Sequence, residues 1–355
     1  MQKTKILVIY PKLGNQITGG HVYDHRFFEA IKKDEQYSLD FLTDDMLRSQ
    51  NKALYNFTYL LEYFRVRKYD IVLTNSRLYT RLFLLFFVLR WTSKVKLIAV
   101  HHHFDFLGQS KKIYKFLELN FLRMLSATII PSPYIKDLFQ NLFPKKKVLY
   151  APLSVEKAIK EISPRKERDV FSIVTVGTIE KRKGISYVID AVGKATTTTG
   201  KKITLTIVGK VIEENYHQTL IEQIKQLGLT DSITFAGRLS NEELSAVYRT
   251  ADCFAFGSQL EGYGMVLLEA MSYGLPLLAF DNTAMPYTVK NEHNGFLIEN
   301  KNVDSFAHAI LRLIEEPALK DKLSKGALED FKSLRTLEEL DKDFSSILSH
   351  RFEHI

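Results

Sequence analysis

Two glutamates, Glu261 and Glu269, lie eight residues apart and flank a short turn that contains Gly262 and Gly264. An apolar run begins within this interval, which predicts a helix that starts near Gly264 and carries Glu269 in its second turn. The first turn of a helix presents backbone N–H groups without intrahelical partners and the positive end of the helix dipole, so it attracts anions. Carboxylates beside an anion site are suited to bind hydroxyl groups. A ligand that carries phosphates and hydroxyls together, such as a nucleotide sugar, fits this arrangement.

The turn between the glutamates supplies the expected phosphate contacts. We expect the backbone N–H groups of Tyr263, Gly264, Met265 and Val266 to face the phosphate, because glycine leaves the backbone accessible. The alternative is a surface helix with two solvated glutamates. The apolar run argues against it, since it leaves little of that helix exposed.

The pattern extends beyond the two glutamates. It contains Glu-Gly-Tyr-Gly at 261–264, Leu-Glu-Ala-Met at 268–271 and Gly-Leu-Pro at 274–276. This frame resembles the Glu-x7-Glu signature of the retaining glycosyltransferases of family GT4, which adopt the GT-B fold. The resemblance implies that Glu261 binds and orients the transferred sugar and that Glu269 holds the ribose hydroxyls, neither acting as a general base. It also implies retention by front-face attack, in which the leaving phosphate accepts the acceptor's proton.

The loop over 176–184 resembles the part of the family's donor site that holds the diphosphate with an arginine and a lysine. Lys183 matches the lysine, and a cation there neutralises the charge that develops on the leaving group. Thr178 stands where arginine is frequent, so Arg182 is the candidate to replace it. A solvated basic loop is the alternative.

Two other glycine-bearing turns resemble donor-binding elements of the family. Gly19 and Gly20 precede a helix predicted near His21, and glycines there permit close approach to the donor. Gly237 and Arg238 end a predicted strand where family members pass under the nucleotide base, although Arg238 could be structural instead.

Three histidines, His101 to His103, follow a strand predicted over 97–100. Family members commonly place a histidine there against the transferred sugar. Strand alignment favours His101, and His102 is the alternative because adjacent side chains alternate faces. Three consecutive histidines in an extended conformation cannot all bind one metal ion, and no carboxylate pair completes a site, so we expect no metal here.

The 355 residues are enough for two domains, each with its own core. The single cysteine, Cys253, lies in an apolar strand and is expected to pack rather than react. The longest apolar run, Leu82 to Leu89, is too short to span a bilayer, and no signal peptide is evident. These features predict a cytoplasmic location.

The net charge of +8 is unevenly distributed. Residues 1–150 contain 24 Lys and Arg against 12 Asp and Glu, a charge of +12, and the remaining residues contain 25 against 29, a charge of −4. Basic clusters and aromatic residues alternate in the first part, which favours an anionic membrane surface or a phosphorylated acceptor. Nucleic acid is less favoured because no nucleic-acid-binding motif accompanies the charge. A solvated lysine-rich surface is the remaining alternative.

Short apolar strands alternate with helical segments, which predicts α/β domains with parallel sheets covered on both faces. Strands are predicted over 5–10, 39–42, 71–74, 97–100, 128–131 and 148–150, and again over 171–176, 203–208, 233–235, 253–256, 277–280 and 296–298. A polar linker is predicted over 156–169. The resemblance to family GT4 implies a GT-B fold of two Rossmann-like, doubly wound domains that face a central cleft. We expect an acceptor-binding domain over 1–155 and a donor-binding domain over 170–336, and the resemblance implies a crossover helix at about 337–355.

These features together predict a metal-independent retaining glycosyltransferase. It would move a hexose-type sugar from a nucleotide-diphosphate sugar, UDP among the nucleotides considered, to a hydroxyl of a lipid-linked or membrane-surface glycan. Its catalytic residues would be Glu261, His101 and Lys183, and it would need no cofactor beyond the donor. It is expected in the cytoplasm, peripheral on the inner face of the cell membrane. The alternatives are a catalytically inactive GT-B partner subunit and a GT-B phosphorylase or epimerase.

Overall fold

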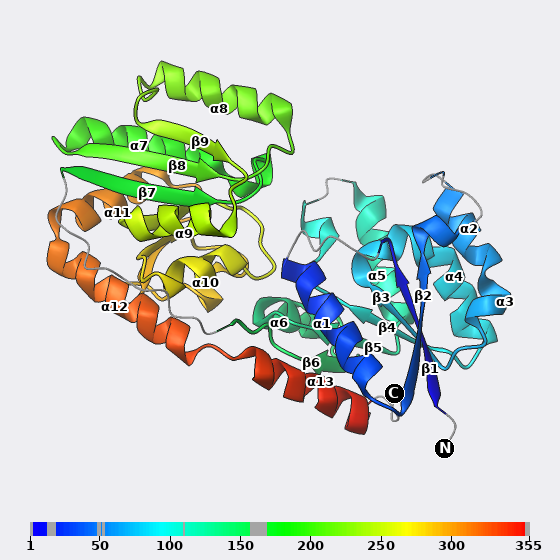
Figure 1. The fold of residues 1–355 in the computed structure, drawn as a ribbon. Coiled ribbons are helices and arrows are strands. Elements are labelled where there is room, and N and C mark those ends of the chain that lie inside the picture. The colour runs from blue at the N-terminus through cyan, green and yellow to red at the C-terminus, as the bar shows by residue number, and fades with distance from the viewer. Residues whose placement is uncertain are drawn as a thin grey trace. The chain divides into compact units, whose positions relative to one another are not determined.

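The computed structural model describes residues 3–12, 19–47, 51, 54–108, 111–156 and 169–351. Contacts divide the chain into two compact units, Met1–Ser154 with Arg335–Ile355, and Val155–Leu334. Each unit contains a six-stranded parallel sheet with helices packed against it (Figure 1). The predicted α/β class with two doubly wound sheets is confirmed. The predicted linker lies largely outside the described residues.

The sheet of the first unit has the strand order β2-β1-β3-β4-β5-β6. Each of its strands forms where the apolar runs predict it: β1 Thr4–Tyr10, β2 Tyr37–Thr43, β3 Ile71–Asn75, β4 Lys96–Val100, β5 Ala127–Ile130 and β6 Val148–Tyr150. The chain adds β2 on one side of β1 and then continues with β3 to β6 on the other side, so the direction of winding reverses between β1 and β3. The carboxyl ends of these two strands are therefore the topological switch point, where open α/β sheets bind ligands.

Helices cover both faces of this sheet: α1 Gly19–Lys33, α2 Tyr55–Leu61, α3 Tyr63–Val66, α4 Tyr79–Thr92, α5 Lys112–Met124, α6 Pro133–Leu142 and α13 Leu337–Arg351. Leu7 and Ile9 of β1 belong to the core under α2, α4, α5 and α6. Tyr10 packs against Phe28 of α1 instead, because successive strand residues alternate faces. The C-terminal helix α13 packs on α1, where the Phe344 and Phe27 rings lie 4.7 Å apart.

The sheet of the second unit has the order β12-β11-β10-β7-β8-β9. Its strands are β7 Val170–Val176, β8 Lys202–Val208, β9 Ile233–Gly237, β10 Cys253–Phe256, β11 Leu277–Phe280 and β12 Gly295–Ile298. Its helices are α7 Ile185–Thr198, α8 Glu214–Gln226, α9 Asn241–Thr250, α10 Met265–Ser272, α11 Val303–Glu315 and α12 Pro317–Ser333. The switch point lies between the adjacent strands β7 and β10, because the chain winds from β7 toward β9 and then returns to the other side of β7. Cys253 is fully buried in β10.

No helix among the described residues is long and apolar enough to cross a membrane.

Candidate functional site

The loops that leave β7 and β10 bring two cations onto one carboxylate. Lys183 Nζ lies 2.6 Å from Glu261 Oε1, and Arg182 donates to the same oxygen at 3.2 Å. The Ser258 hydroxyl donates to it as well, at 2.8 Å. Lys183 and Glu261 are largely buried, with side chains 14% and 13% exposed. The switch point of the second sheet therefore holds a compact, charged cluster formed by Arg182, Lys183 and Glu261.

Charge pairing decides the ionisation of Glu261. Burial alone would raise the pKa of this carboxyl, but Lys183 and Arg182 outweigh it and hold the pKa below the ordinary value of 4.5. Glu261 is therefore ionised at neutral pH. The stability that this pairing contributes is present at neutral pH and is lost only as the pH falls through the lowered pKa.

A second carboxylate positions Arg182. Glu180 Oε1 accepts from Arg182 at 2.8 Å and from the Thr178 hydroxyl at 2.6 Å. Thr178, which replaces the frequent arginine, thus orients the glutamate that holds Arg182. Arg182 lies beside Lys183 and donates to the Leu260 carbonyl at 2.7 Å. That Arg182 takes the role of the missing arginine stays a prediction.

Thr283 fixes the backbone of Glu261 from a third loop. The Glu261 N–H donates to the Thr283 hydroxyl at 3.2 Å, and Thr283 in turn donates to the Asn282 side chain at 2.9 Å. Thr283 has a φ of 43°, in the left-handed region that a β-branched residue seldom adopts. Strain of this kind is typically concentrated at functional sites.

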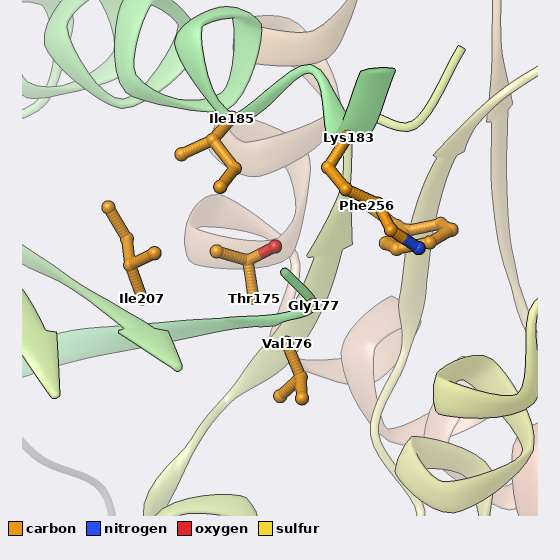
Figure 2. A pocket seen from close by; sticks show the side chains of 7 residues that line it. All are labelled: Thr175, Val176, Gly177, Lys183, Ile185, Ile207 and Phe256. Atoms are coloured by element: carbon orange, nitrogen blue, oxygen red, sulfur yellow. The ribbon is translucent and has the colours of Figure 1, made fainter. Parts of the chain in front are cut away.

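A narrow depression adjoins the cluster at the carboxyl end of β7. Figure 2 shows the amine of Lys183 beside the Phe256 ring, and Lys183 Nζ lies 5.5 Å from the centre of that ring. The depression is lined by Thr175, Val176, Gly177, Lys183, Ile185, Ile207 and Phe256. It is too narrow to admit a water molecule.

Two glycines allow the loops after β7 and β10 to approach each other. Gly184 adopts a φ of 59°, and a Cβ added there would lie 1.9 Å from the Gly257 carbonyl oxygen. A Cβ at Gly257 would lie 2.3 Å from the Gly184 carbonyl oxygen. Neither position accepts a side chain, so the distance that brings Lys183 to Glu261 depends on both glycines.

We expect Gly184→Ala to lower the free energy of unfolding by about 3–5 kcal/mol, because it combines left-handed strain with a backbone clash. Gly228 is the matched control in the same unit, with a φ of 68° and no atom within 4 Å of an added Cβ. Gly228→Ala should cost only about 1–2 kcal/mol of strain. Urea unfolding followed by circular dichroism measures both losses. Tryptophan fluorescence would report on the other unit, because the single tryptophan, Trp91, belongs to it. Equal losses would contradict the close approach of the two loops.

Glu269 lies in the second turn of α10, as predicted. Its hydrogen-bond partner is a tyrosine, unlike the cations that pair with Glu261. Its Oε2 accepts from the Tyr248 hydroxyl at 3.2 Å, and Tyr248 stacks on Tyr273. The Glu269 side chain is exposed overall. Atoms packed around its carboxyl nevertheless restrict hydration and raise its pKa, against the opposing effect of the Tyr248 hydrogen bond. The two glutamates therefore occupy distinct electrostatic environments, which suits two separate binding tasks.

The remaining predicted donor residues of this unit lie at neighbouring strand and helix ends. Helix α10 begins at Met265 after Gly264, whose φ is 85°, so the N–H groups of Met265 and Val266 lie in its first turn, where N–H groups lack intrahelical partners. Tyr263 and Val266 are partly exposed. Gly237 ends β9, where its carbonyl accepts from Gly209 at 2.8 Å. Arg238 is exposed and lies outside the charged cluster.

In the first unit, a buried aspartate collects three side chains near the switch point. Asp24 of α1 is fully buried and accepts from Tyr10 at 2.9 Å and Asn75 at 2.8 Å. His102 Nε2 lies 2.7 Å from the other Asp24 oxygen. Since a carboxylate oxygen accepts, Nε2 carries a proton. Asp24 thus fixes both the orientation and the tautomer of His102.

Gly19 and Gly20 form the first turn of α1, because the helix begins at Gly19 and not near His21. The His102 ring lies over Gly20, where an added Cβ would be 3.5 Å from the ring. The preceding loop, 13–18, lies outside the described residues.

His101 is placed differently from the prediction that ranked it first. It is fully buried, its Nδ1 pairs with the Ser76 hydroxyl at 2.7 Å, and the Phe104 ring packs on it at 4.3 Å. Burial holds the pKa of His101 well below its ordinary value. Among the described residues its Nε2 has no hydrogen-bond partner. His101 is a core residue here, whereas His102 is partly exposed, which favours His102 as the candidate.

The sequence did not identify Ser258, Glu180, Thr283, Tyr248 or Asp24 as part of either site. Asp24 carried a usable signal, because it is an acidic residue on the buried, aromatic-rich face of a helix. Among the described residues, no three His, Cys, Asp or Glu side chains gather as metal ligands would. Metal independence stays a prediction.

Solved structures match nearly the whole chain. Sucrose-phosphate synthase from Thermosynechococcus elongatus matches 99% of this chain and 100% of that chain with a TM-score of 0.77 and 18% identity. Anabaena HepE, solved with UDP and glucose, matches 98% of this chain and 99% of that chain with a TM-score of 0.75 and 18% identity. The predicted GT-B fold is confirmed.

Residues 156–330 match the family Glycosyl transferases group 1, so this part of the chain is a group 1 glycosyltransferase domain. An uncharacterized glycosyltransferase of Methanocaldococcus jannaschii is 30% identical over 46% of this chain and 40% of that protein. A GDP-mannose-dependent alpha-(1-6)-phosphatidylinositol monomannoside mannosyltransferase of Mycobacterium tuberculosis is 33% identical over 28% of each. The chain thus matches less than half the length of these relatives.

Proposed function

We propose that the chain is a retaining glycosyltransferase that uses a nucleotide-diphosphate sugar. The observation that carries this proposal is the cluster of Lys183, Arg182 and Glu261 at the switch point of a group 1 glycosyltransferase domain. Two cations suit a diphosphate, and an ionised carboxylate suits the hydroxyls of a sugar. HepE, which was solved with UDP, and the GDP-mannose-dependent relative support this class of donor.

Donor binding would exchange partners within the cluster. The diphosphate would take Lys183 and Arg182 from Glu261, and Glu261 would then turn to the sugar hydroxyls and orient the ring. The bond between the anomeric carbon and the phosphate oxygen breaks as the acceptor oxygen attacks from the same face. The acceptor's proton passes to the leaving phosphate, whose charge Lys183 and Arg182 neutralise. Because two side-chain cations supply this charge, the proposal needs no metal.

The other residues would position the donor. Glu269 would hold the ribose hydroxyls, and the first turn of α10 would receive the phosphate through its N–H groups. Gly19 and Gly20 would allow close approach at the start of α1. We propose His102, oriented by Asp24, as the histidine that contacts the transferred sugar.

His102→Ala should lower the turnover of the donor about 10- to 100-fold, the cost of one lost hydrogen bond that leaves a polar group unsatisfied. His102→Gln, which can still donate to Asp24, should retain the fold and separate sugar contact from support of Asp24. His101→Ala should instead lower the free energy of unfolding by about 2–4 kcal/mol through a core cavity, with unchanged turnover per folded molecule. Steady-state kinetics and urea unfolding of the three variants measure these effects. The reverse pattern would restore His101 as the sugar-contacting residue.

We propose a lipid-linked or membrane-surface glycan as the acceptor, because the first unit combines the basic excess with exposed aromatic residues. The protein would then work at the membrane surface from the cytoplasm.

A thermal-shift panel of UDP-, GDP- and ADP-sugars tests the proposed donor class. A true donor at 100 times its dissociation constant should stabilise the protein by about 2.7 kcal/mol. Nucleoside monophosphates should give less, because they offer one phosphate to the two cations. A panel without any shift would refute the donor site, and a shift without turnover would favour the inactive partner subunit.

A further inference from the structure

Three neighbouring helices of the first unit expose large apolar side chains to solvent. Leu54, Phe57, Leu61 and Phe64 recur every three or four residues along α2 and α3, so they form one stripe, and Phe64 is 71% exposed. Phe87 and Trp91 form a second stripe on α4, where Trp91 is 77% exposed. Ile113 and Phe116 form a third stripe on α5.

The three stripes belong to one helical layer. Helix α4 packs against both α2 and α5 (Figure 1). The buried sides of all three contribute to a single core over the same face of the sheet, through residues such as Tyr59, Phe86 and Phe121. Their outer sides therefore share a layer facing away from the sheet. We name the exposed apolar residues of this layer the aromatic face: Leu54, Phe57, Leu61, Phe64, Phe87, Trp91, Ile113 and Phe116.

Exposed cations accompany the aromatic face. Residues 54–124 contain 12 Lys and Arg against four Asp and Glu. The exposed cations include Arg67, Lys68, Arg90, Lys94, Lys111, Lys112 and Lys115.

The four acidic residues of this segment all have partners. Glu62 lies 3.6 Å from Arg65, and Asp70 accepts from the backbone N–H of Lys5 at 2.8 Å. Asp105 pairs with His103 at 2.9 Å, and the buried Glu118 accepts two backbone N–H groups. The layer therefore presents uncompensated positive charge beside its apolar side chains.

We infer that the aromatic face docks the protein on the surface of an anionic membrane. Exposed Trp and Phe next to Lys and Arg match the two parts of a membrane interface, its acyl boundary and its anionic head groups. Exposed apolar groups of this density mark an interaction site. A second copy of this chain fits the face poorly, because two such faces would oppose their positive charges. The inference specifies the membrane partner of the proposed function, but binding itself requires neither donor nor acceptor.

The test is co-sedimentation of the purified chain with vesicles of phosphatidylcholine alone and of phosphatidylcholine mixed with phosphatidylglycerol. We expect binding to the mixed vesicles that weakens with added salt. Arg90→Gln with Lys94→Gln should weaken it roughly 25-fold, about fivefold for each charge. Phe64→Ser with Trp91→Ser should weaken it by at least tenfold at low salt as well as high salt.

Matched controls come from the second unit. Lys322→Gln with Lys325→Gln removes two exposed charges there, and Ile212→Ser removes a 56% exposed apolar side chain. Both controls should bind vesicles as the wild type does. Absence of binding to mixed vesicles would overturn the inference, as would equal losses in the control and face variants. Self-association that Phe64→Ser with Trp91→Ser abolishes, without vesicle binding, would assign the face to a second copy.

The failure of this inference is distinguishable from failure of the proposed function. Donor turnover in solution without vesicle binding would refute only the docking surface. Vesicle binding without any donor binding would refute only the glycosyltransferase site.

Discussion

Replacing Glu261 with alanine is expected to lower turnover of a nucleotide-diphosphate sugar by about 100-fold or more, since the ring loses the group that orients it. Binding of the free nucleoside diphosphate should stay unchanged or become up to about tenfold tighter. The reason is that Glu261 occupies Lys183 and Arg182 in the ligand-free protein, so its removal frees both cations for the diphosphate. Kinetics and isothermal titration calorimetry on the same preparations measure the two effects.

A loss of turnover without a loss of nucleotide binding distinguishes the proposal from simple damage to the fold. A merely structural role for Glu261 would weaken nucleotide binding and turnover together. Glu180→Gln is the matched control, because Glu180 also pairs with Arg182 and belongs to the same loop as Lys183. It should change turnover only a few-fold, since a partly exposed ion pair is worth about 1 kcal/mol or less. Circular dichroism establishes that each variant is folded.

Replacing Lys183 with alanine is expected to reduce turnover by about 10²–10³-fold, the usual cost of removing one group that stabilises transition-state charge. Lys183 is suited to this role because it is largely buried, where its charge is poorly screened by solvent. The affinity for nucleoside diphosphate should fall as well, which is the reverse of the effect expected for Glu261→Ala. Lys181→Ala is the matched control, because it removes an exposed lysine two residues away in the same short helix, Lys181–Lys183. Similar losses in both variants would show that general positive charge, and not Lys183, acts on the donor.

The fold was largely predictable because its sheets are buried on both faces. Strands such as Cys253–Phe256 and Leu277–Phe280 are short, continuous apolar runs, and their boundaries match the prediction. The order of the strands and the location of the two switch points follow from pairing between distant segments. The apolar pattern does not specify that pairing, so the sheet topology required the structure.

The charged cluster was predictable to the level of loops and not of contacts. The spacing of the glutamates indicated Glu261 and the family resemblance indicated Lys183 and Arg182, yet neither shows that both cations converge on one carboxylate oxygen. That convergence depends on Gly184 and Gly257, which let two backbones approach more closely than any side chain at these positions would allow. Ser258 and Thr283 are partners whose roles exist only once three loops meet.

The histidines show where strand alternation fails as a guide. Alternation places His101 and His102 on opposite faces, but it does not say which face is covered. The Phe104 and Phe139 rings cover His101, whereas Asp24 on α1 attracts His102 toward Gly20. Apart from Phe104, the deciding residues lie far from the histidines in the sequence. Tertiary packing is therefore needed to tell which of the two histidines is covered.

The most direct test of the donor site is turnover of a panel of UDP-, GDP- and ADP-sugars by the purified chain and by a Glu261→Ala, Lys183→Ala double variant. Release of nucleoside diphosphate, with NMR of the freed or transferred sugar, provides the measurement. We expect the wild type to release one nucleoside diphosphate, to retain the anomeric configuration, and to lose this activity in the folded double variant. Unchanged turnover in the double variant, or no turnover of any donor by the folded wild type, would contradict the account.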